Sequence, residues 1–389
     1  MRIIYATQDV PQSFEKSIFL VGPTPRHPDV PSWRPLMLEA LEGVGYEGVV
    51  FVPEDEGGEW KHSYTDQVEW EHSCLDMSDL VVAWIPRDLE TMPALTTNIE
   101  FGSLLTSGKL LYGRPEEAVK MKYLDHCYQK MWGRVPHTNM VEMADEVMSR
   151  LGVGDLRTGG ERKVPFVVWK TRHFQEWYRT HKKIGNRLDD AKVLWPFFVG
   201  PRKNFLFSFS LWVKVWISSE GRYKENEYIF SRPDISTILA YRKTKGDFLD
   251  TEVVLVREFR SPSRTKDGFI RELPGGSSWK PNKSPEEIAS EELEEETNLV
   301  VSPGNFEKVY SKQVAGTLST YHAHLFSVEL TEEQMEQARK LAKENKAFGV
   351  EEDSERTYAE VSTIRHLLSG RVEVDWSTLG MIFAGLHRI

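Results

Sequence analysis

The stretch Glu272–Leu299 reads ELPGGSSWKPNKSPEEIASEELEEETNL and decides how the second half of the chain folds. After Pro285 it contains no glycine or proline, the two residues that most often interrupt a helix. Ser284 is a favourable N-cap, and proline suits the first helical position because its missing N–H needs no partner there. The sequence therefore predicts a helix from about Pro285 to Thr297.

Three carboxylates of this helix, Glu292, Glu295 and Glu296, follow one another at i, i+3 and i+4. The spacing places them on one helical face, where like charges repel unless solvent or a cation surrounds them. Hard divalent cations such as Mg²⁺ or Mn²⁺ take carboxylate oxygens, and Mg²⁺ often shares its site with substrate phosphates. The Gly275-Gly276 turn upstream allows a ligand to approach the backbone closely. A solvated acidic face and a metal site are both open interpretations.

These residues resemble the Nudix hydrolase family, whose box reads G-x5-E-x7-R-E-U-x-E-E-x-G-U, with U a bulky apolar residue. Five positions match its E, U, E, E and final U: Glu292, Leu293, Glu295, Glu296 and Leu299. The resemblance implies an α/β/α sandwich that hydrolyses a pyrophosphate with Mg²⁺ (or Mn²⁺). It implies metal ligation by Glu292, Glu295 and Glu296, and a catalytic role for Glu295.

The box also departs from the family pattern. Asn298 replaces the closing glycine, which is a mild change because asparagine tolerates a left-handed backbone. Lys283 replaces the first Glu and Glu291 the Arg, while the loop after Gly275 is two residues longer than the pattern. Since that Glu and Arg form an ion pair in the family, we expect Lys283 and Glu291 to form the same pair with reversed charges. An inactive box is the alternative hypothesis.

The chain has 389 residues, which suggests two domains or more, and a net charge of −10, which argues against a nucleic-acid binder. Two cysteines, Cys74 and Cys127, do not make a disulfide framework. We find no signal sequence, and the longest apolar run, Phe205–Ile217, is too short to cross a bilayer. We expect a soluble, cytoplasmic protein that binds neither membranes nor nucleic acid; a homo-oligomer is compatible with the sequence.

Short apolar runs alternate with helical segments in the first part of the chain. The expected strands cover residues 17–21, 49–52, 80–85 and 110–112, and the expected helices cover residues 32–42, 66–76, 98–105 and 139–150. Such alternation predicts a doubly wound parallel sheet, with ligands beyond the carboxyl ends of its strands.

Several segments of this part resemble the nucleoside 2-deoxyribosyltransferase-like family, over roughly residues 15–130. They are FLVGPTPR, QVEWE, DMSDLVVAWIPR, TTNIEFG and KLLYGRP. In that family a Glu in an E-x-G segment attacks the anomeric carbon, and a carboxylate on the preceding helix serves the leaving base. Glu100, with Gly102 two residues on, matches the nucleophile, and Glu71 falls at the second carboxylate, where the family more often has Asp. Two carboxylates suit this chemistry, because one stabilises C1′ while the other protonates the base.

The residues we predict to bind substrate are Gly22, Arg26, Asp79 and Asn98. Arg26 and Asn98 could hold the sugar 5′ end or a 5′-phosphate. Asp79 precedes a buried strand, so a structural role in the helix–strand turn is the alternative for this residue. For Trp33, Trp70 and Trp84, core packing is expected ahead of base stacking.

We place the first domain at residues 1–150 and a glycine-rich, polar linker at residues 151–163. Residues 164–389 would form the Nudix domain with an N-terminal extension. Period-two alternation in Phe205–Ile217 predicts a long half-buried strand, and a helical stretch is expected near Arg172–His181. Glu351 and Glu352 would lie in a catalytic loop, by resemblance to the ADP-ribose pyrophosphatase branch.

The sequence thus predicts a two-domain enzyme acting on a nucleotide or nucleoside, combining N-glycosidic cleavage or transfer with Mg²⁺-dependent pyrophosphate hydrolysis. One alternative makes NAD the substrate, cleaved first to ADP-ribose and then at its pyrophosphate. The other alternative is a nucleotide sensor that has lost catalysis.

Overall fold

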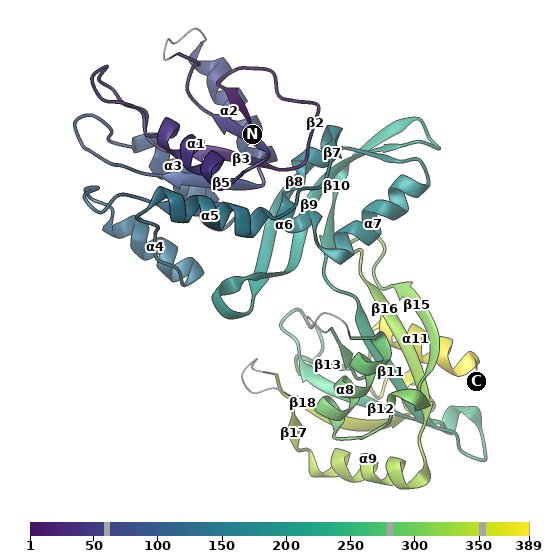
Figure 1. The fold of residues 1–389 in the computed structure, drawn as a ribbon. Helices are drawn as coiled ribbons and strands as arrows, with labels where there is room; N and C mark the ends of the chain where they lie inside the picture. Colours follow the sequence, from purple (N-terminus) through teal and green to yellow (C-terminus); the bar gives the residue numbers. More distant parts are fainter. Residues whose placement is uncertain (58–62, 278–282, 350–354, 389) are drawn as a thin grey trace. The chain divides into compact units, whose positions relative to one another are not determined.

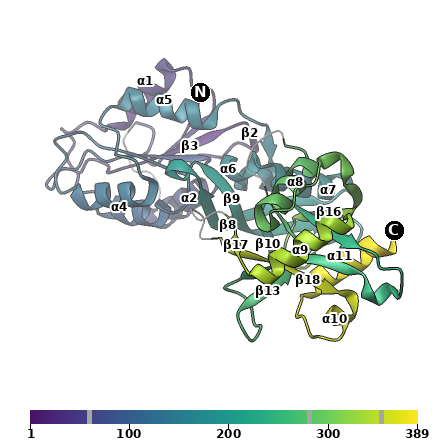
Figure 2. The same cartoon turned by 90° about the horizontal axis from the view of Figure 1, so that it is seen from below.

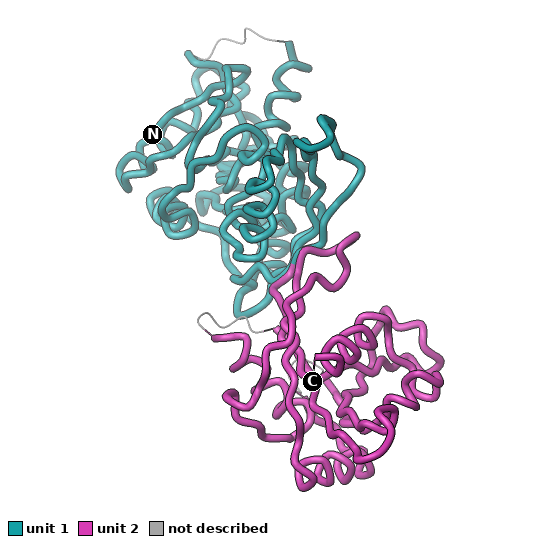
Figure 3. Tube along the Cα trace, turned by 90° about the vertical axis from the view of Figure 1, so that its right-hand side faces the viewer, with its two compact units in different colours: residues 1–231 teal, residues 232–389 magenta. Residues whose placement is uncertain are grey.

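The computed structural model describes residues 1–57, 63–277, 283–349 and 355–388. The chain divides into two compact units, residues 1–231 (unit 1) and residues 232–389 (unit 2), which are coloured separately in Figure 3. Among the described residues, none of the helices combines the length and hydropathy needed to span a membrane.

A parallel sheet lies at the centre of unit 1 (Figure 1). Its strand order is β1 (Arg2–Tyr5), β4 (Val49–Val52), β3 (Ser17–Val21), β5 (Leu80–Trp84) and β6 (Leu110–Gly113). Strands β3 to β6 are buried along their whole length, as expected for strands covered on both faces. The predicted doubly wound sheet is confirmed, with the short edge strand β1 as an addition that the sequence pattern did not reveal.

Helices cover both faces of this sheet. Helices α1 (Arg34–Gly43) and α5 (Met140–Leu151) pack together on one face, and Figures 1 and 2 show them side by side. Helices α2 (Tyr64–Met77), α3 (Leu95–Leu104) and α4 (Lys122–Trp132) contribute to the core on the other face. Alternate residues of β3 enter the two cores, Ile18 and Leu20 one of them and Phe19 and Val21 the other.

The segment predicted as a linker, residues 151–163, is packed structure instead. Strand β7 (Arg157–Thr158) pairs with β2 (Ser13–Phe14), and the 3-10 helix η1 (Gly159–Lys163) follows it directly. Arg157 is completely buried and forms an ion pair with Asp79, with 2.5 Å between Nη2 and Oδ2. The polar composition suggested solvation, but the arginine is neutralised inside the core.

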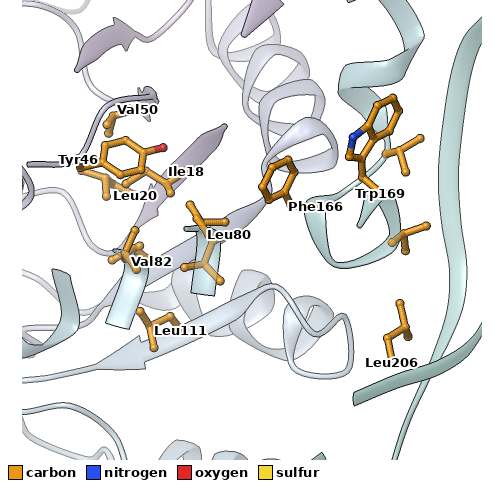
Figure 4. Packing of buried hydrophobic residues seen from close by; sticks show 14 of the residues in the cluster. Ile18, Leu20, Tyr46, Val50, Leu80, Val82, Leu111, Phe166, Trp169 and Leu206 are labelled. Atoms are coloured by element: carbon orange, nitrogen blue, oxygen red, sulfur yellow. The ribbon is translucent and has the colours of Figure 1, made fainter. Parts of the chain in front are cut away.

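Residues 164–231 belong to unit 1, which corrects the expectation that they extend the C-terminal domain. They form α6 (Phe166–Trp169), α7 (Arg172–Lys183), β8 (Arg187–Val199), the 3-10 helix η2 (Pro201–Lys203), β9 (Phe205–Ile217) and β10 (Arg222–Ser231). The strands make an antiparallel sheet in the order β10-β9-β8. Figure 4 shows why the segment cannot be separate: Phe166, Trp169 and Leu206 lie in one hydrophobic cluster with Ile18 and Leu80 of the parallel sheet.

The expected strand at Phe205–Ile217 and the expected helix near Arg172 are confirmed as β9 and α7. The burial phase of β9 differs from the prediction at its start, where Leu206 and Ser208 are buried and Phe205 and Phe207 are partly exposed. The register against β8 shifts between Phe197 and Phe198, opposite this part of β9. This irregularity changes which side chains face the core.

Unit 2 contains a mixed sheet with the strand order β15-β16-β11-β12-β18-β17, and β13 and β14 attach to β12 and β11. The strands are β11 (Ile235–Arg242), β12 (Glu252–Phe259), β13 (Phe269–Glu272), β14 (Gly275–Gly276), β15 (Glu307–Gln313), β16 (His322–Glu329), β17 (Ala347–Phe348) and β18 (Thr357–Thr363). Helices α8 (Pro285–Thr297) and α9 (Glu332–Glu344) pack on one face of the sheet. Helices α10 (Ile364–Leu368) and α11 (Trp376–His387) pack on the other face, so unit 2 has three layers.

Helix α8 begins and ends where the sequence predicts. Ser284 Oγ accepts a hydrogen bond from the Glu287 backbone N–H at 3.2 Å, and Glu287 Oε2 accepts from the Ser284 N–H at 2.8 Å. At the other end Asn298 adopts the left-handed conformation, with φ of 54°. These two caps fix the helix that carries the three glutamates. Glu351 and Glu352 lie outside the described residues.

Candidate active site

A cavity of about 920 Å³ lies within unit 1. Its lining includes the turn after β3, helix α2, the start of α3, and residues of η1, α6 and β8. The turn after β3 follows the carboxyl end of a parallel strand, which is where this fold class places its ligands. The cavity is large enough for a molecule of nucleotide size.

Glu100 on α3 and Glu71 on α2, the two residues of this unit for which the resemblance implies catalytic roles, both line this cavity. Burial, with added repulsion from Glu71, raises the pKa of Glu100 to about 7. Burial also raises the pKa of Glu71, although the Gln67 amide opposes this by donating to Glu71 Oε1 at 2.8 Å. The charge of Glu71 therefore affects the protonation of Glu100, so the two groups titrate as interacting sites.

Arg34 is a buried cation whose charge reaches both carboxylates, and we did not predict it. Its side chain is fully buried beneath the cavity and its charge lowers the pKa of both Glu100 and Glu71. The guanidinium is held by Glu54 Oε1 at 2.5 Å from Nη1 and by the Gly22 carbonyl at 2.7 Å from Nη2. A buried arginine at the start of a helix has no motif that distinguishes it from a surface arginine, so only the fold reveals it.

Gly22 lies in the cavity wall, and its lack of a side chain is required there. A Cβ atom at this position would lie 2.2 Å from the Trp84 carbonyl oxygen and 2.5 Å from the Trp33 ring. The glycine therefore lets the turn after β3 pack closely against the end of the neighbouring strand β5. Trp33 and Trp84 are buried core residues, and Trp70 packs on Phe19, so core packing is confirmed for these tryptophans.

The other predicted binding residues are not all brought together. Arg26 lines the cavity with an exposed side chain. Asn98 does not line the cavity, and its side-chain oxygen accepts a hydrogen bond from Arg87. Asp79 lies outside the cavity too, and its carboxylate accepts hydrogen bonds from Arg157, from the Ser17 N–H at 2.8 Å and from the Phe166 N–H at 2.9 Å. These contacts support the structural alternative for Asp79.

One wall of the cavity comes from residues that the sequence did not connect with it. They are Lys163, Pro165, Val167, Val168, Ala191, Lys192, Val193, Leu194 and Pro196. Their elements pack against the parallel sheet only through tertiary contacts, so no local pattern marks them. The expectation of a domain boundary before residue 164 also hid them.

Comparison with known proteins agrees with this part of the chain. Residues 15–118 match the family model described as "Nucleoside 2-deoxyribosyltransferase like". No curated protein matches the chain. The match supports a nucleoside 2-deoxyribosyltransferase-like domain at the N-terminus, of the glycosyl-transfer type, and links the chain to nucleoside or nucleotide metabolism. The cavity wall formed by residues 163–196 lies outside the matched residues.

In unit 2, Glu292 and Glu296 of α8 lie against the turn before it. Glu296 is buried and its Oε2 accepts from the Gly275 N–H at 2.8 Å, while a Cβ on Gly276 would lie 2.6 Å from the Glu292 carboxylate. Burial, with repulsion from Glu295, raises the pKa of Glu292 to about 7. Burial, with repulsion from Glu292, raises the pKa of Glu296 well above its usual value.

Two further observations bear on a metal in unit 2. The part of the chain that the structure describes contains no group of three or more His, Cys, Asp or Glu side chains arranged to hold a metal ion. Glu295 is exposed, whereas the charge of Glu355 reaches both Glu292 and Glu296 and raises their pKa values. The two inner carboxylates thus have the donor chemistry for a hard cation, and Glu355 is a residue that we did not predict.

The reversed pair of the box is confirmed, since Lys283 Nζ contacts Glu291 Oε2. The contact joins the loop before α8 to the second turn of the helix. Both side chains keep some exposure, and the charge of Lys283 also lowers the pKa of Glu292.

Proposed function

We propose that unit 1 cleaves an N-glycosidic bond of a nucleoside or nucleotide, or transfers the sugar to another acceptor. The observation that carries this proposal is the pair Glu100 and Glu71 in one cavity over the buried cation Arg34, within residues that match the deoxyribosyltransferase-like model. Two interacting carboxyl groups lose their protons in two steps, and one proton stays on the pair between those steps. The reaction needs one ionised and one protonated carboxyl group.

In this proposal Glu100 attacks or stabilises C1′ and Glu71 protonates the departing base. As the C1′–N bond breaks, its electron pair goes to the base, and the proton of the pair neutralises that base. The sugar forms an ester with the nucleophile, which water or a second base then displaces. The resemblance assigns the role of nucleophile to Glu100. If Glu71 were the nucleophile instead, the sugar ester would form on Glu71.

The test of this function is incubation of the full chain with a panel of nucleosides and nucleotides, with free base detected by mass spectrometry. Glu71→Gln and Glu100→Gln keep the size of the side chain. Glu100→Gln should abolish release of base, and Glu71→Gln should strongly lower the release of bases that need a proton to leave. Glu69→Gln is the matched control, because Glu69 lies on the same helix but is exposed and does not line the cavity. Release of base that survives both cavity substitutions would contradict the proposal.

We propose a second activity for unit 2, the Mg²⁺-dependent hydrolysis of the pyrophosphate in a nucleoside diphosphate derivative. The supporting observation is the mutual repulsion of Glu292 and Glu296 beside the Gly275-Gly276 turn, which a bound cation would relieve. Glu292, Glu295 and Glu296 would hold the metal. When bound, Mg²⁺ would neutralise developing phosphate charge and activate water.

The same panel tests this second activity when it is run with Mg²⁺ and with a chelator. Metal-dependent release of a nucleoside monophosphate supports it. NAD in the panel tests whether the two activities act in sequence, since glycosidic cleavage gives ADP-ribose and the second site would split that product. Binding of nucleotides without turnover of any of them would favour the sensor hypothesis instead.

A further inference from the structure

The cavity of unit 1 has a basic end that the glycosidic chemistry does not use. Lys109, Lys163 and Lys192 all line it and gather around the last turn of α2. Lys109 Nζ donates to the Leu75 and Asp76 carbonyls at 2.7 and 3.2 Å. Lys163 Nζ donates to Ser73 Oγ at 3.4 Å, and Lys192 Nζ lies 3.8 Å from Asp76 Oδ2. Three cations from three different elements therefore meet at one place.

Positive charge at this end exceeds what the neighbouring carboxylate balances. Asp76 is half exposed and pairs with Lys192 only at long range. Lys109 is buried, and its burial lowers its pKa to about 8. Asp76 and Asp79 oppose this shift and Lys163 and Lys192 reinforce it, but Asp79 is already paired with Arg157. Since Lys163 and Lys192 both make Lys109 harder to protonate, an anion among the three lysines would offset this repulsion.

The basic end lies at a definite distance from the carboxylate pair. Glu71 and Asp76 are five residues apart on α2, which corresponds to about 7.5 Å along the helix axis. Apolar side chains line the cavity as well, among them Val68, Leu75, Val167 and Leu194. The cavity thus combines carboxylates, an apolar wall and lysines, which suits an extended ligand with an anionic group away from its reacting carbon.

We propose that Lys163 and Lys192 form an anion subsite that binds a phosphate of the substrate while its glycosidic carbon lies at Glu100. The substrate class is then a nucleotide rather than a nucleoside. The proposal rests on the N-glycosidic function proposed above. A phosphate can be the 5′-monophosphate or the outer phosphate of a diphosphate, and both have the chemistry that lysine ammonium groups recognise. Neither lysine lies within residues 15–118, so the proposed subsite comes from the cavity wall of residues 163–196, outside the family match.

The experiment measures binding and turnover separately for 2′-deoxynucleosides and their 5′-mono- and diphosphates. Calorimetry gives the dissociation constants, and release of base gives kcat/KM. Lys163→Ala and Lys192→Ala should each weaken binding of the preferred phosphorylated probe about tenfold, the usual size of one lost charged hydrogen bond, and leave the nucleosides unchanged. Comparing mono- with diphosphate shows which phosphate occupies the subsite.

Lys183→Ala is the matched control, because Lys183 is an exposed lysine of unit 1 that does not line the cavity. Lys109 is not substituted, because its ammonium group donates to two carbonyls in the last turn of α2 and its loss would disturb the helix. Arg26→Ala tests the competing cation: a loss of phosphate affinity in this variant alone would overturn the proposal. Unchanged affinity in both lysine variants, or no binding of any phosphorylated probe, would also overturn it. Lysine-dependent binding without release of base would support the subsite and contradict the proposed function.

Discussion

Glu100 of unit 1 and Glu292 of unit 2 have the same raised pKa of about 7, but their surroundings differ. Glu100 has one carboxylate neighbour, Glu71, and a buried arginine whose charge opposes the shift. Glu292 is surrounded by several carboxylates, and Lys283 is the cation that opposes them. Burial is the main cause in both units. The comparison teaches that the pKa alone does not define a site; the charge balance around it does.

The charges around Glu100 and Glu292 bear on which unit needs a metal. In unit 1 the protein supplies its own cation, so the carboxylates can act in proton transfer and nucleophilic attack without a metal ligand. In unit 2 the inner carboxylates repel one another, and the divalent cation that we propose would relieve this repulsion. We therefore expect metal to affect the reaction of unit 2 and to leave that of unit 1 unchanged.

The largest effect is expected from Glu295→Gln, which removes one anionic ligand of the proposed metal site. Pyrophosphate hydrolysis should be almost completely lost, since a metal site needs its full set of charges to hold Mg²⁺. Release of free base should continue at the native rate. Glu294→Gln is the control, because Glu294 is exposed on the same helix and occupies an unspecified position of the box. Equal loss of both activities would remove the contrast between the units.

Glu71→Ala should lower the rate for a poor leaving base by about 10²- to 10⁴-fold, the usual contribution of a general acid. A base that departs without protonation, such as a cationic N-alkylated purine, should be affected far less. The measurement is kcat for a series of bases of rising leaving ability, in the native chain and in the variant. An equal loss across the series would mean that Glu71 positions the substrate and does not transfer a proton.

The pH dependence of glycosidic cleavage should differ between the same two kinds of base. The last proton of the pair is lost near pH 7, because burial and Glu71 raise the pKa of Glu100 to about 7. A poor leaving base needs that proton, so its rate should fall about tenfold per pH unit above 7. A base that leaves unaided needs only the ionised nucleophile, so its rate should not fall there. Neither profile should move on addition of Mg²⁺; a shift with Mg²⁺ would refute the metal-independence of unit 1.

The smallest effect concerns the ion pair of Lys283 and Glu291. Glu291→Arg alone should place two cations together and destabilise unit 2, whereas Lys283→Glu with Glu291→Arg should restore the pair. A double-mutant cycle on the free energy of unfolding should give a coupling on the order of 0.5–3 kcal/mol, near the lower end because both groups are partly exposed. Additive effects would show that the contact contributes nothing to stability.

Local patterns explain what the sequence could predict. The helix of unit 2 follows from Ser284 and Pro285, whereas Glu100 and Glu71 of unit 1 are predicted by the resemblance to the deoxyribosyltransferase-like family. Arg34 could not be predicted, because its partners Gly22 and Glu54 meet it only through the arrangement of β3 and β4.

Long-range pairing explains the wrong expectations. Asp79 resembles a site residue in sequence, but its partner Arg157 is 78 residues away and lies in the segment that we predicted as a linker. Residues 163–196, which follow directly, line the cavity. The misplaced domain boundary near residue 163 therefore concealed both the role of Asp79 and this wall of the cavity. Tertiary burial of a charged side chain leaves no local signal in a single sequence.

The central claim is that Glu100 forms a covalent bond with the sugar. A nucleoside or nucleotide with a 2′-fluoro substituent slows the breakdown of the sugar ester, so the ester should accumulate once binding of the compound has been shown. Intact-protein mass spectrometry should then show one added glycosyl group, and fragmentation should place it on Glu100. The adduct should be absent in Glu100→Ala and present in the Glu69→Gln control. Glycosidic cleavage at the native rate by Glu100→Ala, or an adduct located on Glu71, would contradict the account.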